Sequence, residues 1–553
     1  MAKILVLGGY GVFGGRLARR LVQETDAEIL VAGRSLDKAR KHCEKHGGTP
    51  LELDCDGDLT ANFVRLRPMI VVDAAGPFQA YGEDPYRVAR AAIAAGAHYL
   101  DLADDGPFVV CIGALDTAAR AAGVAVLSGA SSVPAISSAA LDRLTEGMIS
   151  VSSVYSAILP GNRAPRGLSV VRAIVAQAGR PLKIWCGGRQ TIIPAWGAVN
   201  RRDLEIDGLA PLRGRLASPV GAPDLLLFRD RYGARTVGFG AGLELKVLHF
   251  GLWALALPVR WRRLKSLSPL APAVKWIADR LERFGSDRGG MIARAAGRDR
   301  DGNAVERTWT LIAESGDGPE IPPTPTLLLA KRLLGANGLA PGARPAVGVL
   351  SLAEIEAGLA GFAIRFGMDE RPATPLLEQV LSRDLARLPA EWRRLAEIYD
   401  CDTFAGEASV ERSKGLLSGL AGWTFGFPAE TQKVTVEVFK ERTAFGERWT
   451  RRFAGKPFVS HLSRKPDDPP GRLTERFGPF GFALRLSAAD GRVIWPVESW
   501  RFLGIPMPKA LMPRSETAEY VEDGRFHFDV GISLPLAGLV VRYRGWLTPV
   551  SEA

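Results

Sequence analysis

A glycine-rich segment near the start of the chain has the residue types that can hold a phosphate group. Residues 8–14 follow a short apolar run at Lys3–Leu7, and glycines stand at positions 9, 11 and 14. Such glycines permit a tight turn and a close approach of the backbone to a pyrophosphate, and the helix that follows offers free N–H groups. The pattern alone is common, but its place between a predicted strand and a predicted helix is typical of a dinucleotide site. The residues expected to line it are Gly8, Gly9, Tyr10, Gly11, Val12, Phe13 and Gly14.

The residues after the second predicted strand favour one dinucleotide over another. An acidic side chain about 20 positions beyond the glycines would hold the ribose hydroxyls of NAD. The sequence instead has Arg34 and Ser35 there. A guanidinium pairs with a phosphate in a fork geometry, so we expect NADP rather than NAD, with the 2′-phosphate at Arg34. A solvated surface arginine is the alternative interpretation.

Two further segments are expected beside the cofactor. Asp54 follows the third predicted strand, where it would lie near the adenine. Ala75, Gly76 and Pro77 follow the fourth strand, where the chain of such folds crosses close to the cofactor.

The elements that must position these residues alternate between strand and helix. Apolar runs that predict strands occur at residues 3–7, 28–32, 51–54, 69–74, 98–102 and 124–127. Helical patterns separate several of them, which predicts an α/β class with a Rossmann-type, doubly wound parallel sheet over residues 1–130. Residues 320–365 return to a helical pattern and are expected to complete this domain.

The rest of the chain predicts two more domains. An alternating pattern at residues 151–159 and a hairpin turn at residues 301–303 indicate an α+β substrate or dimerisation domain over residues 131–319. Residues 371–553 begin with a helical pattern at 376–398 and then become a C-terminal antiparallel β-rich domain.

Composition excludes several classes of protein. The chain has 553 residues, of which 47% are hydrophobic and 24% charged, so it is neither disordered, collagen-like nor a coiled coil. The net charge of +11 is spread along the sequence, which fits anionic small ligands and does not indicate nucleic acid. We expect a cytoplasmic protein, with membrane association and a homodimer as open alternatives.

The cysteines and histidines predict neither disulfides nor a metal site. The cysteines are Cys43, Cys55, Cys111, Cys186 and Cys401. Because none forms a Cys-x-x-Cys pair and their number is odd, they are interpreted as reduced thiols. The six histidines lack the spacing of zinc ligands, so no metal is expected.

Residues 247–265 have two interpretations. An apolar run at 247–259 is followed by a basic cluster at 260–265. The run is too short to span a bilayer, which needs about 20 residues. It is either a buried packing helix or an interfacial helix, with Trp253 and Trp261 at the headgroups and the basic cluster on anionic lipid.

Several segments resemble the saccharopine dehydrogenase-like oxidoreductases. They are GGYGVFG from Gly8, AGR from Ala32, AAGPFQAYGEDP from Ala74, AGAHYLDLADD from Ala95, SGASSVPAISSAA from Ser128 and PTPTLLLAKRLL from Pro323. The resemblance covers roughly residues 1–365 and implies NADP-dependent hydride transfer. RRFAGKPFVS from Arg451 and GRFHFDVGISLPLAG from Gly524 resemble a bacterial domain of unknown function that is found fused to such dehydrogenases.

The sequence leaves the catalytic group open. Asp101, His98 and Tyr81 are candidates, because they belong to segments near the carboxyl ends of predicted parallel strands, where ligands bind. Strand packing is the alternative for His98, and turn structure is the alternative for Tyr81. The chain is therefore expected to be an NADP-dependent oxidoreductase of a small or lipophilic substrate. The alternative is a dinucleotide-binding regulatory or membrane-surface protein without turnover.

Overall fold

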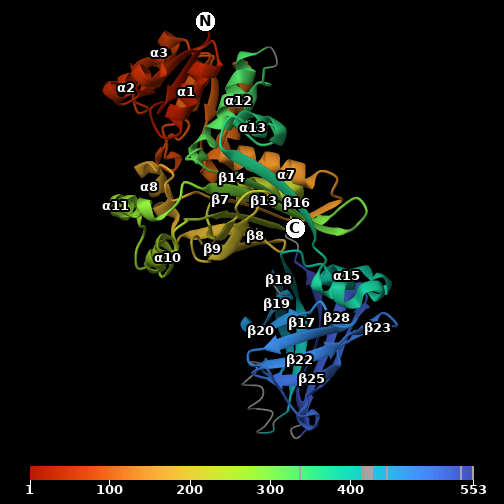
Figure 1. Cartoon of the computed structure of the whole chain (residues 1–553). Helices are drawn as coiled ribbons and strands as arrows, with labels where there is room; N and C mark the ends of the chain where they lie inside the picture. Colours follow the sequence, from red (N-terminus) through yellow and green to blue (C-terminus); the bar gives the residue numbers. More distant parts are fainter. Residues whose placement is uncertain (336–337, 414, 416–426, 444–445, 536–537, 551–553) are drawn as a thin grey trace.

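The computed structural model describes residues 1–335, 338–413, 415, 427–443, 446–535 and 538–550. The chain forms three parts, each with the fold class that the sequence predicted (Figure 1). An α/β part contains the N-terminus, a mixed sheet lies in the middle, and an antiparallel sheet forms the far end.

The first sheet is parallel, and its strand order explains where the glycine-rich segment lies. Within the described chain it has seven strands in the order β15-β6-β5-β4-β1-β2-β3. Strands β1 (Lys3–Leu7) and β4 (Ile70–Asp73) are neighbours, although the chain passes through β2 (Glu28–Gly33) between them. Order reverses at that point, and ligands of open α/β sheets bind at such a reversal, beyond the carboxyl ends of the strands.

Helices cover both faces of this sheet, and one of them comes from far along the chain. Helix α1 (Gly14–Glu24) places Leu17 and Leu21 in the same apolar core as Leu327 of α12 (Pro323–Leu334). Helices α3 (Leu59–Leu66), α4 (Arg87–Ala94) and α5 (Gly106–Cys111) bury their apolar sides in the core of the opposite face. After α12, strand β15 (Gly342–Pro345) pairs with β6 (Ala125–Ser128) at the edge of the sheet.

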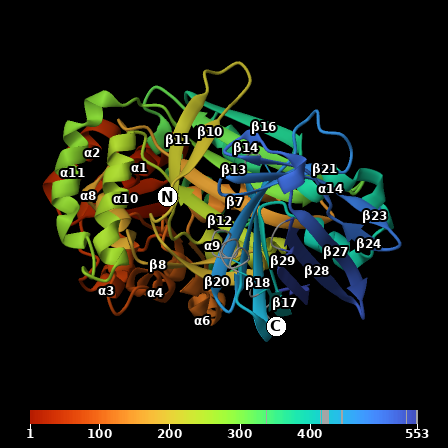
Figure 2. The same ribbon diagram turned by 90° about the horizontal axis from the view of Figure 1, so that it is seen from below.

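The middle part is built on a second sheet. Its main path runs β10 (Asn200–Leu204), β11 (Leu212–Pro219), β12 (Thr236–Ala241), β7 (Ser150–Leu159), β13 (Gly289–Arg298), β14 (Ala304–Ala313) and β16 (Ile364–Pro372). A hairpin of β8 (Pro181–Cys186) and β9 (Arg189–Pro194) pairs with β12. Helices α8 (Leu168–Gln177), α10 (Lys246–Arg260) and α11 (Ala271–Arg280) lie side by side, away from the C-terminal strands (Figure 2).

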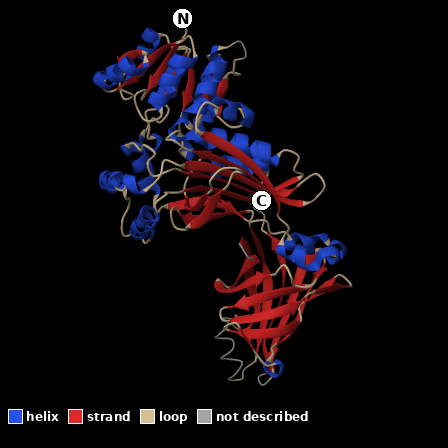
Figure 3. Cartoon of the chain, in the orientation of Figure 1, coloured by secondary structure: helices blue, strands red, loops and turns tan. Residues whose placement is uncertain are grey.

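The C-terminal part has its own apolar core. Its antiparallel sheet curves around that core, and short helices lie at one end (Figure 3). The helical pattern predicted over residues 376–398 is interrupted in the structure: α14 spans Leu376–Leu381 and α15 spans Ala390–Ala396. The interruption has a local cause, because Ser382 adopts φ 48° and Pro389 precedes α15.

The prediction that all five cysteines are reduced is wrong for two of them. Cys186 at the end of β8 and Cys401 at the start of β17 (Cys401–Arg412) form a disulfide, with their Cα atoms 6.2 Å apart. They are 215 residues apart in the sequence, so only the docking of the middle part against the C-terminal part brings them together. Cys43, Cys55 and Cys111 are free thiols.

Candidate functional site

The glycine-rich turn is packed so closely that its glycines cannot be replaced without movement. Gly8 has φ +70°, and a Cβ atom there would lie 2.6 Å from the carbonyl oxygen of Ala74. A Cβ atom at Gly14 would lie 2.3 Å from the carbonyl oxygen of Gly8. Gly11, in contrast, is exposed on the outside of the turn. The turn therefore holds β1, β4 and α1 together and leaves one backbone surface open.

The start of α1 offers backbone donors beside that surface. Neither Val12 nor Phe13 donates its N–H to any residue that the structure describes. Free N–H groups at a helix start bind phosphate. Tyr10 fixes the neighbouring strand end, because its hydroxyl accepts the Ser35 N–H at 3.1 Å. The residues present thus fit a dinucleotide pyrophosphate.

The residues expected to select the dinucleotide lie at the same edge of the sheet. Arg34 is exposed after β2 and makes no ion pair with a described residue, while Ser35 caps α2 (Leu36–His46). Asp54 is exposed beyond β3 (Thr49–Glu52) and accepts the Asp56 N–H at 3.2 Å. Ala75, Gly76 and Pro77 follow the carboxyl end of β4 and therefore lie at the same edge of the sheet.

A buried pair of carboxyl groups ends β4 and its neighbour on the side away from β1. Asp73 of β4 lies opposite Asp101 of β5 (His98–Asp101) in the parallel register. Asp101 accepts the N–H groups of Gly129 at 2.7 Å and Ala103 at 3.0 Å, and burial raises its pKa to about 7. Burial likewise raises the pKa of Asp73 to about 6. These acids hold the loops of the site in place.

Two of the candidate catalytic residues have structural partners. The Tyr81 hydroxyl donates to the Asp73 carboxyl at 2.8 Å, so it orders the turn after β4. His98 is at the amino end of β5, and its Nδ1 atom accepts the Ala125 N–H at 3.0 Å. Ligands of such sheets bind at the carboxyl ends of the strands, so this placement removes His98 from the candidate catalytic groups.

A cavity of about 320 Å³ extends from the glycine-rich edge into the middle part of the chain. On the nucleotide side it is lined by Phe13, Asp104, Ser131 and Ser132. On the other side the lining is largely apolar, and it includes Ile158, Ile174, Trp196, Val220, Phe239 and Met291. A mainly apolar cavity with a few convergent polar groups is typical of a small-molecule site. We refer to it below as the interdomain cavity.

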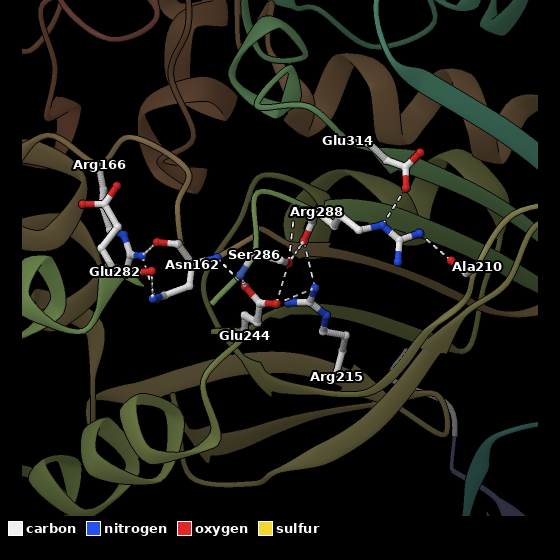
Figure 4. Close-up of polar contacts among 9 residues, drawn as sticks. All are labelled: Asn162, Arg166, Ala210, Arg215, Glu244, Glu282, Ser286, Arg288 and Glu314. Atoms are coloured by element: carbon white, nitrogen blue, oxygen red, sulfur yellow. Dashed lines mark hydrogen bonds and ion pairs between the residues drawn. The ribbon is translucent and has the colours of Figure 1, made fainter. Parts of the chain in front are cut away.

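A polar network holds the loops on the middle-domain side of this cavity (Figure 4). The carboxylate of Glu244 accepts the backbone N–H of Asn162 at 2.6 Å, the Ser286 hydroxyl at 2.6 Å and the Ser286 N–H at 2.9 Å. Arg215 pairs with the same carboxylate at 3.1 Å. These hydrogen bonds and the ion pair hold the pKa of Glu244 below its usual value despite burial, so the carboxylate is charged at neutral pH.

Arg166 lines the cavity on the other side of Asn162. Its guanidinium donates to Asn162 Oδ1 at 2.8 Å, and Asn162 Nδ2 donates to the Leu281 carbonyl at 2.8 Å. Sequence reasoning missed this network. The signal was present, since residues 160–166 form a Pro- and Gly-containing loop with one Asn and two Arg directly after a strand.

Helix α10 partly matches both interpretations of residues 247–265. His249, Leu252, Ala256 and Val259 are buried against the middle part, whereas Val247 is 67% exposed. Trp253 is half-buried and donates its indole N–H to the Gly197 carbonyl at 3.2 Å, whereas Trp261 is 61% exposed. The described residues include no helix that is both long and apolar enough to cross a bilayer.

Sequence comparisons identify two regions. Residues 4–131 match the saccharopine dehydrogenase NADP-binding domain, and residues 388–547 match a domain of unknown function, DUF4166. Both matches confirm the resemblances seen in the sequence. No curated protein matches the chain.

Solved dehydrogenase structures resemble parts of the chain at low identity. The apo saccharopine dehydrogenase (L-Glu forming) of Saccharomyces cerevisiae is 16% identical, with 67% of this chain and 100% of that chain covered and a TM-score of 0.48. The WlbA dehydrogenase of Thermus thermophilus, in complex with NAD and UDP-GlcNAcA, is 13% identical, with 65% and 93% covered and a TM-score of 0.30. Biliverdin reductase of Synechocystis, in complex with biliverdin and NADP+, is 11% identical, with 65% and 96% covered and a TM-score of 0.30.

Proposed function

We propose that this chain, whose N-terminal region is an NADP-binding domain of saccharopine dehydrogenase type, is an NADP-dependent oxidoreductase of a mainly apolar small molecule. The observation that carries the proposal is the continuity of one cavity from Phe13 and Ser132, beside the glycine-rich turn, to the apolar lining of the middle part. The bound cofactor supplies or accepts the hydride. The protein supplies the position of the substrate and the exclusion of water.

Arg34 is proposed to select NADP over NAD. Its exposure and lack of an ion pair among the described residues leave the guanidinium available for a 2′-phosphate. The full-length protein is titrated with NADPH and NADH by fluorescence. Arg34→Ala should weaken NADPH binding about tenfold or more and leave NADH binding unchanged, as expected from the loss of a charged hydrogen-bonded pair.

Arg40→Ala is the matched control, because Arg40 is likewise exposed, lies on α2 directly after Arg34, and has only a 3.9 Å contact with Asp37. If both variants bind NADPH as the unaltered protein does, the proposed role of Arg34 is wrong. If the unaltered protein binds neither NADPH nor NADH, the oxidoreductase proposal as a whole is wrong.

Asp104 is the group that we propose exchanges a proton with the substrate. It is exposed and lines the interdomain cavity, whereas Asp101 is buried and occupied by backbone N–H groups. Asp104→Asn should slow NADPH oxidation in a panel of apolar ketones and imines while NADPH affinity is retained. An unchanged rate with a substrate from this panel would exclude the role.

A second proposal concerns the surface of the middle part. Between residues 247 and 284 several large apolar side chains are exposed: Val247, Phe250, Leu255, Trp261, Leu264, Leu270, Trp276, Ile277 and Phe284. We call these side chains the apolar patch. Arg260, Arg262, Arg263 and Lys265 interrupt it. Apolar side chains with interspersed cations suit the surface of an anionic bilayer, from which an apolar substrate could be drawn.

Liposome flotation tests this surface. Vesicles with phosphatidylserine should bind the protein at low salt, and vesicles of phosphatidylcholine alone should bind it less. Replacing Trp261 and Phe284 by Ser should release it, since each is 61% exposed. Ile192→Ser is the control, because Ile192 is 64% exposed but lies on β9. No flotation with either vesicle would overturn the membrane proposal and leave the oxidoreductase proposal standing.

A further inference from the structure

The C-terminal sheet surrounds a second cavity, of about 140 Å³. We call it the C-terminal cavity. Residues Val436, Val438 and Lys440 of β18 (Thr431–Thr443) line it together, because alternate residues of a strand point to the same face. Its volume is close to that of cavities that hold one benzene ring, at roughly 150 Å³.

The walls of the C-terminal cavity are strongly aromatic. Its lining includes Trp449, Phe453, Phe482, Trp495, Phe528 and Tyr543. Aromatic walls provide a large apolar contact area and specific ring-to-ring geometry. Such a lining favours an apolar guest that contains a ring or a short hydrocarbon chain.

Charged side chains among these rings distinguish the cavity from an ordinary core. Lys440 is 3% exposed, donates to the Leu395 carbonyl at 2.8 Å and lies 3.9 Å from the centre of the Trp449 ring. Glu519 of β27 (Arg514–Glu522) is 9% exposed and also lines the cavity. Burial raises the pKa of Glu519 to about 7 and lowers that of Lys440 to about 8. Because burying charges is costly, a wall that served packing alone would not need them.

The charges of the wall compensate one another. Arg451 pairs with Glu475 at 3.2 Å, and the charge of Lys440 is balanced by Glu447 and Glu519, whose attraction opposes the burial effect on the lysine pKa. The buried and half-buried charges of this described lining therefore each have an opposite charge nearby, whereas Arg514, which also lines the cavity, is exposed. An ionic guest would have to break such a pair, which is unfavourable in a buried site.

We propose that the C-terminal cavity binds an uncharged, mainly apolar small molecule that carries one hydrogen-bonding group, such as an alcohol or a phenol. The aromatic rings contact the apolar part of the ligand, and the carboxyl group of Glu519 forms a hydrogen bond with its polar group. This site is separate from the glycine-rich turn and does not depend on the proposed oxidoreductase activity.

Calorimetric titration of the full-length protein with toluene, 4-methylphenol and 4-methylbenzoate tests the ligand class. 4-Methylphenol should bind most tightly. Toluene should bind about tenfold more weakly, which is the effect of one lost hydrogen bond in a buried site. 4-Methylbenzoate should be weakest. Tightest binding by the benzoate, or no binding by any of the three, would overturn the proposal.

Two cavity-filling variants locate the binding. Val438→Phe fills the C-terminal cavity and should abolish 4-methylphenol binding, whereas Ala173→Phe fills the interdomain cavity and should leave it unchanged. Retained NADPH binding and an unchanged circular dichroism spectrum show that Val438→Phe is folded. If Ala173→Phe removes the binding and Val438→Phe does not, the phenol occupies the other cavity and the proposal is wrong. The probe series on the unaltered protein decides the ligand class independently of either variant.

Discussion

The two cavities of this chain have similar apolar walls but are built in different ways. Loops that follow strand ends, at residues 131–133, 160–166 and 242–244, contribute much of the interdomain cavity, and they come from two parts of the chain. The C-terminal cavity is lined mostly by alternate positions of the strands of one sheet. Loops that carry function are usually held by a rigid scaffold, whereas strand positions fix side chains directly.

The different positions of the two cavities fit different functions. The interdomain cavity extends to Phe13 of the glycine-rich segment, which is where the proposed function needs its substrate to meet the cofactor. The C-terminal cavity belongs to a part of the chain with a separate apolar core. In the two proposals, the first cavity therefore transforms its ligand and the second only holds one.

The largest expected effect concerns the covalent link between the two parts. In the chain-entropy account, a disulfide that closes a loop of 215 residues stabilises by at most about 5 kcal/mol. Cys186→Ser with Cys401→Ser should therefore lower the temperature at which the parts unfold. Cys111→Ser is the control, because Cys111 is an exposed free thiol. If the two cavities bind independently, both should keep their ligands in the double variant, and loss of 4-methylphenol binding would contradict the separation.

The next variant should impair nucleotide binding and leave the C-terminal cavity unaffected. Gly14→Val places side-chain atoms where even a Cβ would lie 2.3 Å from the Gly8 carbonyl oxygen, so the turn must move. NADPH binding should fall at least about a hundredfold, roughly 3 kcal/mol, while 4-methylphenol binding stays unchanged. Gly113→Ala is the matched control, since a Cβ there would meet nothing within 4 Å. A similar loss in the control would show that the effect is not specific to the turn.

The glycine-rich turn and the nucleotide fold could be predicted from the sequence because their signals are local. A turn with glycines at fixed spacing directly after an apolar strand has few structural alternatives. A helical pattern was also predicted within residues 320–365, where α12 lies, although nothing local shows that this helix packs beside α1.

The substrate side could not be predicted, because its residues come together only through tertiary structure. Glu244, Asn162 and Ser286 belong to three separate loops, and no spacing in the sequence links them. The Cys186–Cys401 disulfide was missed for the same reason. His98 shows a different error, because it is the first residue of the strand predicted at residues 98–102, and that position already indicated the amino end of a parallel strand.

Acid should change the stability of the middle part and that of the C-terminal part in opposite directions. His249, on the buried face of α10, has its pKa lowered by burial to about 4 from 6.5, so the unfolded chain takes up a proton first as pH falls. Its contribution to stability is complete above pH 6.5 and is lost by pH 4, at roughly 2–3 kcal/mol. Glu519 has its pKa raised to about 7 from 4.5, so the folded state takes up the proton first and the cost of burial is relieved between pH 7 and 4.5.

Unfolding of His249→Phe and of Glu519→Gln is measured from pH 7.5 to pH 4. The first variant should lose the acid-induced destabilisation of the middle part, and the second should lose the acid-induced gain of the C-terminal part. His461→Gln is the control, because His461 is exposed on β20 (Lys456–Ser463). Equal pH profiles for His249→Phe and the unaltered protein would show that His249 does not govern the middle part.

The smallest expected effect is at the contact between the middle part and the C-terminal part of the chain. Arg189 of β9 pairs with Glu437, which lies between the cavity-lining Val436 and Val438 on β18 but points to the outer face. Arg189 is 48% exposed, so Arg189→Ala should cost below about 1 kcal/mol of stability.

Arg235→Ala is the contrasting variant, because it removes a partner 2.8 Å from Asp402, whose side chain is 4% exposed. It should destabilise by more, since Asp402 then remains buried with less compensation. If Arg189→Ala changes 4-methylphenol affinity as strongly as Val438→Phe does, the outer face of β18 controls the C-terminal cavity, and the two cavities are coupled rather than independent.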